Sequence, residues 1–140
     1  MRKRIITATA VICLLLSGCT SEKETAEQKV TEIKIYDYED FMPDENGREN
    51  NDPVVITDSE TIAELTKLGG DTSLYKEWTG EQYEGMNSYW IDYGNGLIVG
   101  MYDDIDYGNF CEYAGEPYGS PYYKIPDGLR ERVIELSGKE

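Results

Sequence analysis

The apolar positions along the chain form three kinds of pattern. A mainly apolar run, Ile5–Leu16, follows three basic residues at positions 2–4, and small residues come directly after it. A polar stretch, Thr20–Gln28, comes next and lacks aromatic or large aliphatic side chains. From Val30 onwards, short apolar patterns of period two alternate with helical spacing, and turn-forming residues separate them. This change of pattern predicts an amino-terminal segment and a flexible tether ahead of one folded domain, residues 30–140.

Short apolar runs in the folded part predict its strands. Ile33 and Ile35 share one face of a first strand within residues 30–38, and Tyr36 lies on the other face. Further strands are predicted at three short runs, 54–56, 110–113 and 122–125. Residues 71–87 fit neither period, and we expect an irregular segment whose aromatic side chains partly cover the core.

The stretch Ser88–Tyr102 predicts a β-hairpin. Its central Asn95-Gly96 pair favours a two-residue type I′ turn, because both residues tolerate a positive φ. That register places Ile91 opposite Gly100, where a strand glycine indicates a bulge or a close backbone approach. Both faces of the hairpin are substantially apolar, so we expect it to be covered on both sides.

Two stretches have the spacing of amphipathic helices. The first begins at Thr57, and Glu60 three residues later would complete a capping box. The glycine pair at 69–70 supplies a left-handed residue to end it. The second helix covers 129–136, with Asp127 as its expected cap. Two helices among short strands predict an α+β fold, a mainly antiparallel sheet with both helices packed on one face.

Charge narrows the class of partner. The chain has 13 basic and 28 acidic residues, a net charge of −15, and residues 1–18 contain three of the basic ones and none of the acidic ones. The chain from residue 19 onwards therefore has ten basic residues and a net charge of −18. This excess argues against nucleic acid, because nothing would neutralise its phosphates. It favours cationic proteins, peptides or divalent cations, mainly by raising association rates.

Histidine and cysteine content limits the chemistry. The chain has no histidine, which excludes Ser-His and Cys-His nucleophilic pairs and histidine-ligated zinc or haem. Cys13 and Cys19 both precede the predicted folded domain, so Cys111 is the one cysteine of residues 30–140 and has no partner there for an internal disulfide. We expect Cys111 to act as a buried small hydrophobic residue.

The end of the first apolar run, Leu16-Ser17-Gly18-Cys19, resembles the lipobox of bacterial lipoproteins at each of its four positions. The resemblance implies a signal peptide at residues 1–18 and cleavage between Gly18 and Cys19. It also implies acylation of Cys19, which would anchor the chain to membrane lipid on the extracytoplasmic face. Residues 19–29 would be the lipidated cysteine and its tether. The order of elements is similar to that of small uncharacterised lipoproteins of Gram-positive bacteria.

Two acidic turns suggest a divalent-cation site. Asp103, Asp104 and Asp106 form one candidate, because Asp104 and Asp106 match the first two ligand positions of a calcium loop. The third ligand of that loop would be Gly108, and its twelfth position, where a bidentate glutamate belongs, is Gly115. The other candidate is the acidic loop 43–53. A solvated turn without metal is the alternative for both, and no other cofactor is predicted.

Tyrosine is the unusual residue type here, with twelve against two phenylalanines. Tyr and Trp combine a rigid apolar body with a polar tip, which suits both binding surfaces and half-exposed sheets. One hypothesis is an aromatic groove that stacks on a sugar or peptide. Its candidate residues are Trp78, Tyr83, Trp90, Tyr113 and Tyr118.

These patterns lead to a function hypothesis without a specific activity. We expect a lipid-anchored binding module for a cationic protein, a peptide or a cell-wall polymer. A calcium-binding structural or sensing domain is the alternative, and a carboxylate-based hydrolase is a third hypothesis. No catalytic motif is found, so no catalytic residue is predicted and the chain is expected not to be an enzyme.

Overall fold

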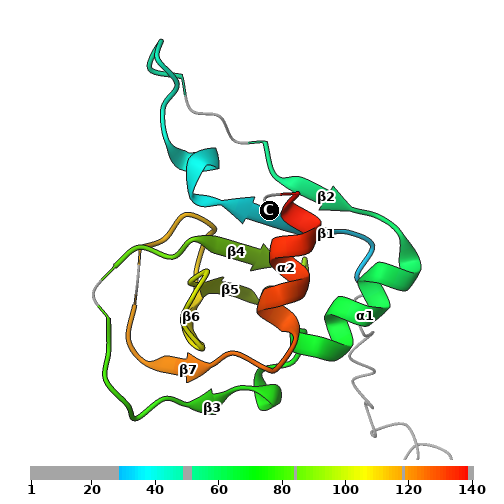
Figure 1. The fold of residues 1–140 in the computed structure, drawn as a ribbon. Helices are drawn as coiled ribbons and strands as arrows, with labels where there is room; N and C mark the ends of the chain where they lie inside the picture. The colour runs from blue at the N-terminus through cyan, green and yellow to red at the C-terminus, as the bar shows by residue number, and fades with distance from the viewer. Residues whose placement is uncertain (1–28, 49–51, 84, 118, 139–140) are drawn as a thin grey trace, which may run out of the picture.

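A computed structural model describes residues 29–48, 52–83, 85–117 and 119–138. The expected signal peptide, Cys19 and most of the tether lie outside these residues. The described part contains a seven-stranded antiparallel sheet in the order β2-β1-β4-β5-β6-β7-β3 (Figure 1). Its strands are β1 (Ile33–Asp37), β2 (Val54–Ile56), β3 (Lys76–Glu77), β4 (Tyr89–Asp92), β5 (Ile98–Met101), β6 (Tyr107–Cys111) and β7 (Tyr122–Lys124).

Two α-helices and two 3₁₀ turns complete the described chain, and the predicted α+β fold is confirmed. They are α1 (Ser59–Gly69), α2 (Leu129–Ser137), η1 (Tyr38–Phe41) and η2 (Thr72–Leu74). The turn that follows η1 projects away from the sheet (Figure 1). Among the described residues, no helix has the length and apolar character needed to cross a membrane.

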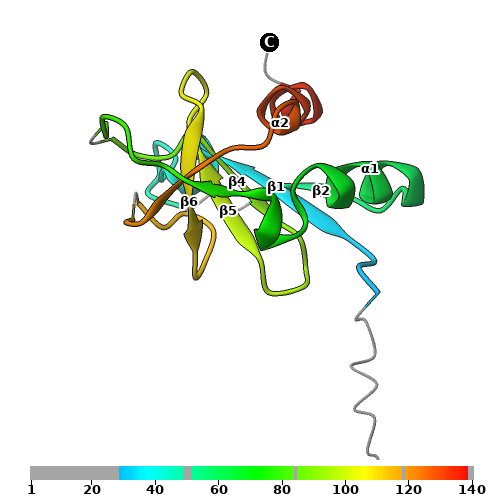
Figure 2. The ribbon, with the colours of Figure 1, turned by 90° about the horizontal axis from the view of Figure 1, so that it is seen from below.

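The main core lies between the helices and one face of the sheet, which we call the inner face. Figure 2 shows α2 lying across this face. Ile62 and Leu65 of α1 and Leu129 and Val133 of α2 belong to one buried cluster. The sheet contributes Ile33, Ile35, Tyr89, Ile91, Val99 and Met101 to the same cluster. Burial of these side chains, at about 1.5–3 kcal/mol each, is the main force holding the layers together.

The helix boundaries differ from the predicted ones in their caps. Asp58, not Thr57, caps α1, and its carboxylate accepts the N–H of Thr61 at 2.8 Å. Gly128 precedes α2 without a side-chain cap, so the prediction of Asp127 is wrong. Gly70 ends α1 with a φ of −79°, not in the left-handed region. Packing requires a glycine at position 69 instead. A Cβ atom on Gly69 would lie 2.6 Å from the hydroxyls of both Tyr75 and Tyr93.

The hairpin forms, but its register is one residue away from the predicted one. The N–H of Tyr93 donates to the carbonyl of Leu97 at 3.0 Å, so the turn has three residues instead of two. Gly94 and Gly96 both have a positive φ, 68° and 93°. Two left-handed glycines therefore favour a longer turn than the Asn95-Gly96 pair alone suggested. Gly100 pairs with Trp90, and the side chains of β5 exchange faces relative to the prediction.

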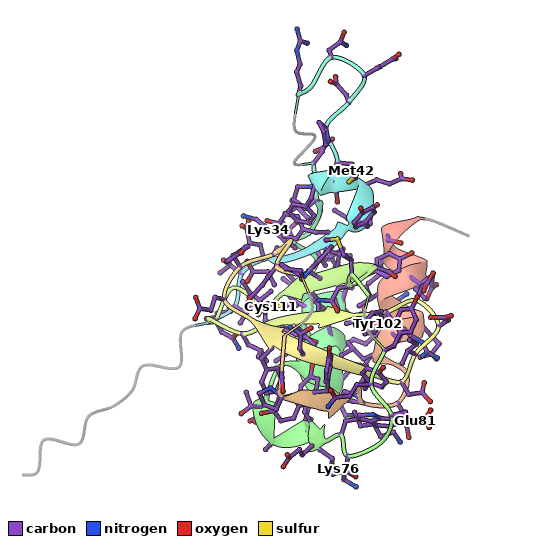
Figure 3. All side chains as sticks on the ribbon, turned by 90° about the vertical axis from the view of Figure 1, so that its left-hand side faces the viewer. Lys34, Met42, Lys76, Glu81, Tyr102 and Cys111 are labelled. Atoms are coloured by element: carbon purple, nitrogen blue, oxygen red, sulfur yellow. The ribbon has the colours of Figure 1, made fainter. Side chains whose placement is uncertain are left out.

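The other face of the sheet, the outer face, carries its own side-chain rows. One row crosses β1, β4, β5 and β6 as Lys34, Asp92, Ile98 and Cys111. The next row contains Tyr36, Trp90, Gly100, Asn109 and Tyr122. In Figure 3, Lys34 and Cys111 lie on the side of the sheet away from α2. Segments that are distant in the sequence cover the second row and leave much of the first row open.

Candidate functional site

A groove of about 680 Å³ lies on the outer face, over the row that begins with Lys34. We call it the outer groove. Its volume falls within the range of ligand pockets, about 300–1,000 Å³. Three aromatic, three charged and three small or aliphatic residues line it, namely Tyr36, Phe41, Tyr113, Lys34, Asp92, Glu112, Ile98, Pro53 and Ala114. The groove therefore combines aromatic surface with carboxylates.

Strand pairing places the floor of the groove. Lys34 on β1 pairs with Asp92 on β4, and Asp92 pairs with Ile98 on β5. Directly opposed residues of antiparallel strands have Cβ atoms about 4.5–5.5 Å apart and share a face. The three side chains consequently lie in sequence across the floor, with the apolar Ile98 next to the carboxylate of Asp92.

The charged side chains of the groove differ in how far other residues already pair with them. The amine of Lys34 lies 3.1 Å from Glu32, outside the groove lining, and the hydrogen bond and charge of Glu32 raise the pKa of Lys34. One carboxylate oxygen of Asp92 accepts the N–H of Gly94 at 2.8 Å. Glu112 is exposed and lies on the groove wall. The free charge that the groove offers to a ligand is thus mainly negative.

One wall of the groove, residues 112–116, is tied to the sheet by hydrogen bonds. The indole N–H of Trp90 donates to the carbonyl of Glu116 at 3.0 Å. The carboxylate of Glu116 in turn accepts the N–H of Glu112 at 2.6 Å, and the N–H of Glu116 donates to the carbonyl of Tyr113. These contacts fix the backbone that presents Glu112 and Tyr113, so the wall is formed before any ligand binds.

Phe41 lies on the opposite wall of the groove, and its aromatic ring lies next to Gly115 of the wall formed by residues 112–116. Its centroid lies 5.5 Å from that of Tyr36 in a stacked pair and 5.0 Å from that of Trp90, edge to face. Gly115 has a φ of +91°, and a Cβ atom there would lie 2.7 Å from the ring of Phe41. A glycine is therefore required where the two walls meet, for both its conformation and its lack of a side chain.

A buried polar cluster lies beside the groove, next to the wall formed by residues 112–116. The amide nitrogen of Asn87 donates to the side-chain oxygen of Asn109 at 3.0 Å, and the nitrogen of Asn109 lies 3.3 Å from the sulfur of Cys111. Asn87 and Asn109 are essentially inaccessible. Cys111 is a buried free thiol, as predicted, and burial raises its pKa to about 11, with the charge of Glu116 adding to the effect.

The five predicted aromatic residues do not form one surface. Of the four that the structure describes, only Tyr113, 59% exposed, lines the outer groove. Trp90 is fully buried beneath Phe41 and acts through its indole N–H. Trp78 and Tyr83 lie elsewhere on the outer face, and Tyr118 is outside the described residues. Whether Tyr113 contacts a ligand stays a prediction.

Trp78 and Tyr83 belong to a second aromatic cluster built around Tyr102, Tyr107 and Tyr122. The ring of Trp78 lies 4.9 Å from that of Tyr107, and the ring of Tyr83 lies 5.9 Å from that of Tyr102. The hydroxyl of Tyr107 accepts the N–H of Tyr83. These contacts hold residues 78–83 over the sheet, which gives much of the tyrosine content a packing role.

The acidic turn at 103–106 is engaged in an ion pair. A carboxylate oxygen of Asp106 accepts a hydrogen bond from Arg130 at 2.8 Å. Within the described ranges, no three acidic or cysteine side chains are grouped closely enough to hold a metal ion. In the other candidate loop, the carboxylate of Asp44 accepts the N–H groups of Asn46 and Arg48, each at 2.8 Å. Calcium binding at either turn stays a prediction.

A second hollow, of about 380 Å³, lies at the ends of β1 and β4, and Tyr38, Met86 and Asp103 are among its lining residues. Asp37 also lines it, but its carboxylate accepts the N–H groups of Glu39 and Asp40 and caps η1. The outer groove has the larger volume, about 680 Å³, and three aromatic residues in its lining, so it is the stronger candidate for a binding site.

Sequence reasoning did not find Tyr36, Phe41, Asp92 or Glu112 as site residues. The period-two pattern did place Tyr36 on the outer face of β1, which was the one available signal. The remaining residues meet only through strand pairing and loop packing. Comparisons of the chain with family models, curated proteins and solved structures found no match.

Proposed function

We propose that this chain is a lipid-anchored extracytoplasmic binding module whose outer groove takes a segment of a cationic protein or peptide. The observation that carries the proposal is the groove itself, in which aromatic side chains and the carboxylates of Asp92 and Glu112 line about 680 Å³. Grooves that combine apolar surface with a few convergent polar groups are the usual form of a binding site.

The charge of the chain supports a cationic partner. Beyond residue 18 the net charge is −18, and Coulomb attraction of this sign raises the association rate of cationic partners. A neutral wall polymer would gain no Coulomb attraction from these carboxylates, so we favour a polypeptide. The lipobox resemblance at Leu16–Cys19 supports the membrane anchor, which would hold the domain where exported proteins encounter it.

Site-specific photocrosslinking tests the location of binding. Tyr113 and Tyr83 are a matched pair, because their exposed fractions are 59% and 58% but only Tyr113 lines the groove. A photoreactive phenylalanine analogue is placed at either position of the full-length chain in membranes. We expect position 113 to crosslink to a protein partner, and added salt to reduce the yield.

Equal crosslinking from positions 83 and 113 would contradict a site in the groove. A yield from position 113 that does not fall with salt would contradict the electrostatic part of the proposal. Identification of the crosslinked partner by mass spectrometry then allows its charge to be compared with the prediction.

A further inference from the structure

We infer that the outer groove recognises an arginine side chain of its polypeptide partner. The inference rests on the proposed function, because it assumes that a polypeptide occupies the groove. It goes further in naming the chemical group that the groove binds. Three features carry it: two carboxylates on either side of an apolar floor, an exposed aromatic side chain beside them, and a resident cation that is already paired.

The two carboxylates lie on either side of Ile98. Asp92 pairs with Ile98, and Ile98 pairs with Cys111, which directly precedes Glu112. Strands lie about 4.8 Å apart, so the backbones that carry the two acids are separated by about 10 Å. The apolar Ile98 in between suits the methylene stem of a long cationic side chain, whose charged head stays close to the carboxylates.

An aromatic side chain adjoins the carboxylates. Tyr113 follows Glu112 directly, lines the groove and is 59% exposed. A guanidinium group is planar, so it can stack on an aromatic face while its N–H groups donate to carboxylates. An ammonium group is a compact, strongly hydrated point charge, which makes it a poorer match to two carboxylates and a ring at once.

The lysine in the groove offsets only part of the negative charge of this site, because its main partner is Glu32 and the charge of Asp92 acts on it to a lesser degree. The amine of Lys34 lies 3.1 Å from the carboxylate of Glu32, and neither residue is deeply buried. Gly94 donates to Oδ1 of Asp92 and leaves the other carboxylate oxygen, Oδ2, to a ligand, and Glu112 is exposed. The positive charge of Lys34 should still weaken binding of a cation, so its removal gives a test with the opposite sign.

The test measures binding of three heptapeptides that differ only in a central residue, which is arginine, lysine or citrulline, between uncharged apolar flanks. Citrulline keeps the shape of arginine and removes its charge. Dissociation constants are measured by fluorescence polarisation on the full-length chain in mild detergent. We expect the citrulline peptide to bind about tenfold, and the lysine peptide about threefold, more weakly than the arginine peptide.

Variants locate the effect. Glu112→Gln should weaken the arginine peptide by about threefold and leave the citrulline peptide unchanged. Lys34→Gln should strengthen binding of the arginine peptide. Glu77→Gln makes the same charge change as Glu112→Gln but on the far strand β3, and it should have no effect. Asp92→Asn tests the other carboxylate, with its urea midpoint measured alongside because Asp92 also supports the hairpin turn.

The inference is overturned if the arginine and citrulline peptides bind equally, or if Glu112→Gln weakens both to the same degree. In either case crosslinking from position 113 would still support a peptide site, so the proposed function would survive. Soluble wall-polymer fragments that bind the wild-type chain and Glu112→Gln equally, without any peptide binding, would overturn both proposals.

Discussion

The side-chain amide of Asn87 occupies the space that a Cβ atom on Gly100 would need. The two residues come from different parts of the outer face, and their contact brings the segment before β4 down onto β5. The amide nitrogen of Asn87 then reaches Asn109 on β6 at 3.0 Å. This relationship makes Gly100 a requirement of packing, although its backbone needs no left-handed conformation.

We therefore predict that Gly100→Ala destabilises the domain by about 3 kcal/mol, through overpacking and the loss of a buried hydrogen bond. Urea unfolding measures the change. Gly96→Ala is the control: nothing lies within 4 Å of a Cβ atom there, so only the strain of its φ of +93° remains, about 1 kcal/mol. Equal losses in the two variants would contradict the packing argument.

Trp90→Phe should loosen the wall of the outer groove. The substitution keeps an aromatic ring in the core but removes the N–H that donates to the carbonyl of Glu116 at 3.0 Å. We expect a loss of about 1–3 kcal/mol in the free energy of unfolding. Hydrogen exchange should increase at residues 112–116, and binding of the arginine peptide should weaken without any change to a residue that lines the groove. Unchanged exchange there would show that other contacts hold the wall.

Asp58→Ala should lower the melting temperature by about a few degrees at pH 7, because it removes the cap of α1. Hydrogen bonds from the backbone and side chain of Thr61 lower the pKa of Asp58. Its stabilisation is therefore present above the ordinary pKa of about 3.9 and is lost as the pH falls through the lower pKa of the folded state.

The difference between wild type and Asp58→Ala should accordingly shrink below about pH 4 in melts recorded across pH. Glu60→Gln changes the same charge in the first turn of α1 but keeps the cap, so it should lower the melting temperature by less than Asp58→Ala does. A difference between Asp58→Ala and wild type that grows on acidification would have the wrong sign for a lowered pKa.

Cys111 should resist alkylation in the folded protein. Burial raises its pKa to about 11, so little thiolate is present at pH 8 and the thiol is shielded from solvent. Peptide mapping after iodoacetamide treatment should show Cys111 unmodified in buffer and modified in urea. Rapid labelling in buffer would contradict the burial of this thiol.

The raised pKa of Cys111 also gives a stability effect at high pH. The thiol contributes stability below its unfolded pKa of about 8.5, and this contribution is lost as the pH rises towards about 11. Cys111→Ala should show a smaller loss of urea midpoint than wild type between pH 8 and 11. Both proteins contain the same tyrosines, so the difference between the two pH profiles reports the thiol.

Cys19→Ser should release the chain from the membrane fraction or leave it unprocessed, because the implied acyl anchor requires the thiol. Metabolic labelling with a fatty-acid probe measures this directly. A Thr20→Ser variant changes the neighbouring residue and should keep its label. Persistent labelling of Cys19→Ser would contradict the lipobox assignment.

Several local features of the fold followed from the sequence. Val54–Ile56 forms β2 with the predicted bounds, and the alternation of Ile33 and Ile35 places them on the inner face of β1. The burial of Cys111 was also predicted from its lack of a partner. In each case a side-chain pattern within a few residues carries the information, since burial on one face imposes its own period.

The hairpin register and the helix caps needed the structure. Asn95-Gly96 is a strong turn signal, but Gly94 also adopts a positive φ, and a longer turn moves β5 by one residue. Because side chains alternate between faces, that single step decides that Val99 lies with the inner core and Ile98 lies on the floor of the groove. Local preference could not separate the two registers, because both faces of the hairpin are apolar.

The outer groove is wholly a product of tertiary structure. The sequence by itself determined the acidic charge, the abundance of tyrosine, the lipobox resemblance and most of the strands and helices. Pairing of β1, β4 and β5 placed Lys34, Asp92 and Ile98 in one row, and packing of Phe41 against Gly115 joined the two walls. The physical reason is that the site depends on contacts between residues far apart in the chain, for which local periodicity carries no information.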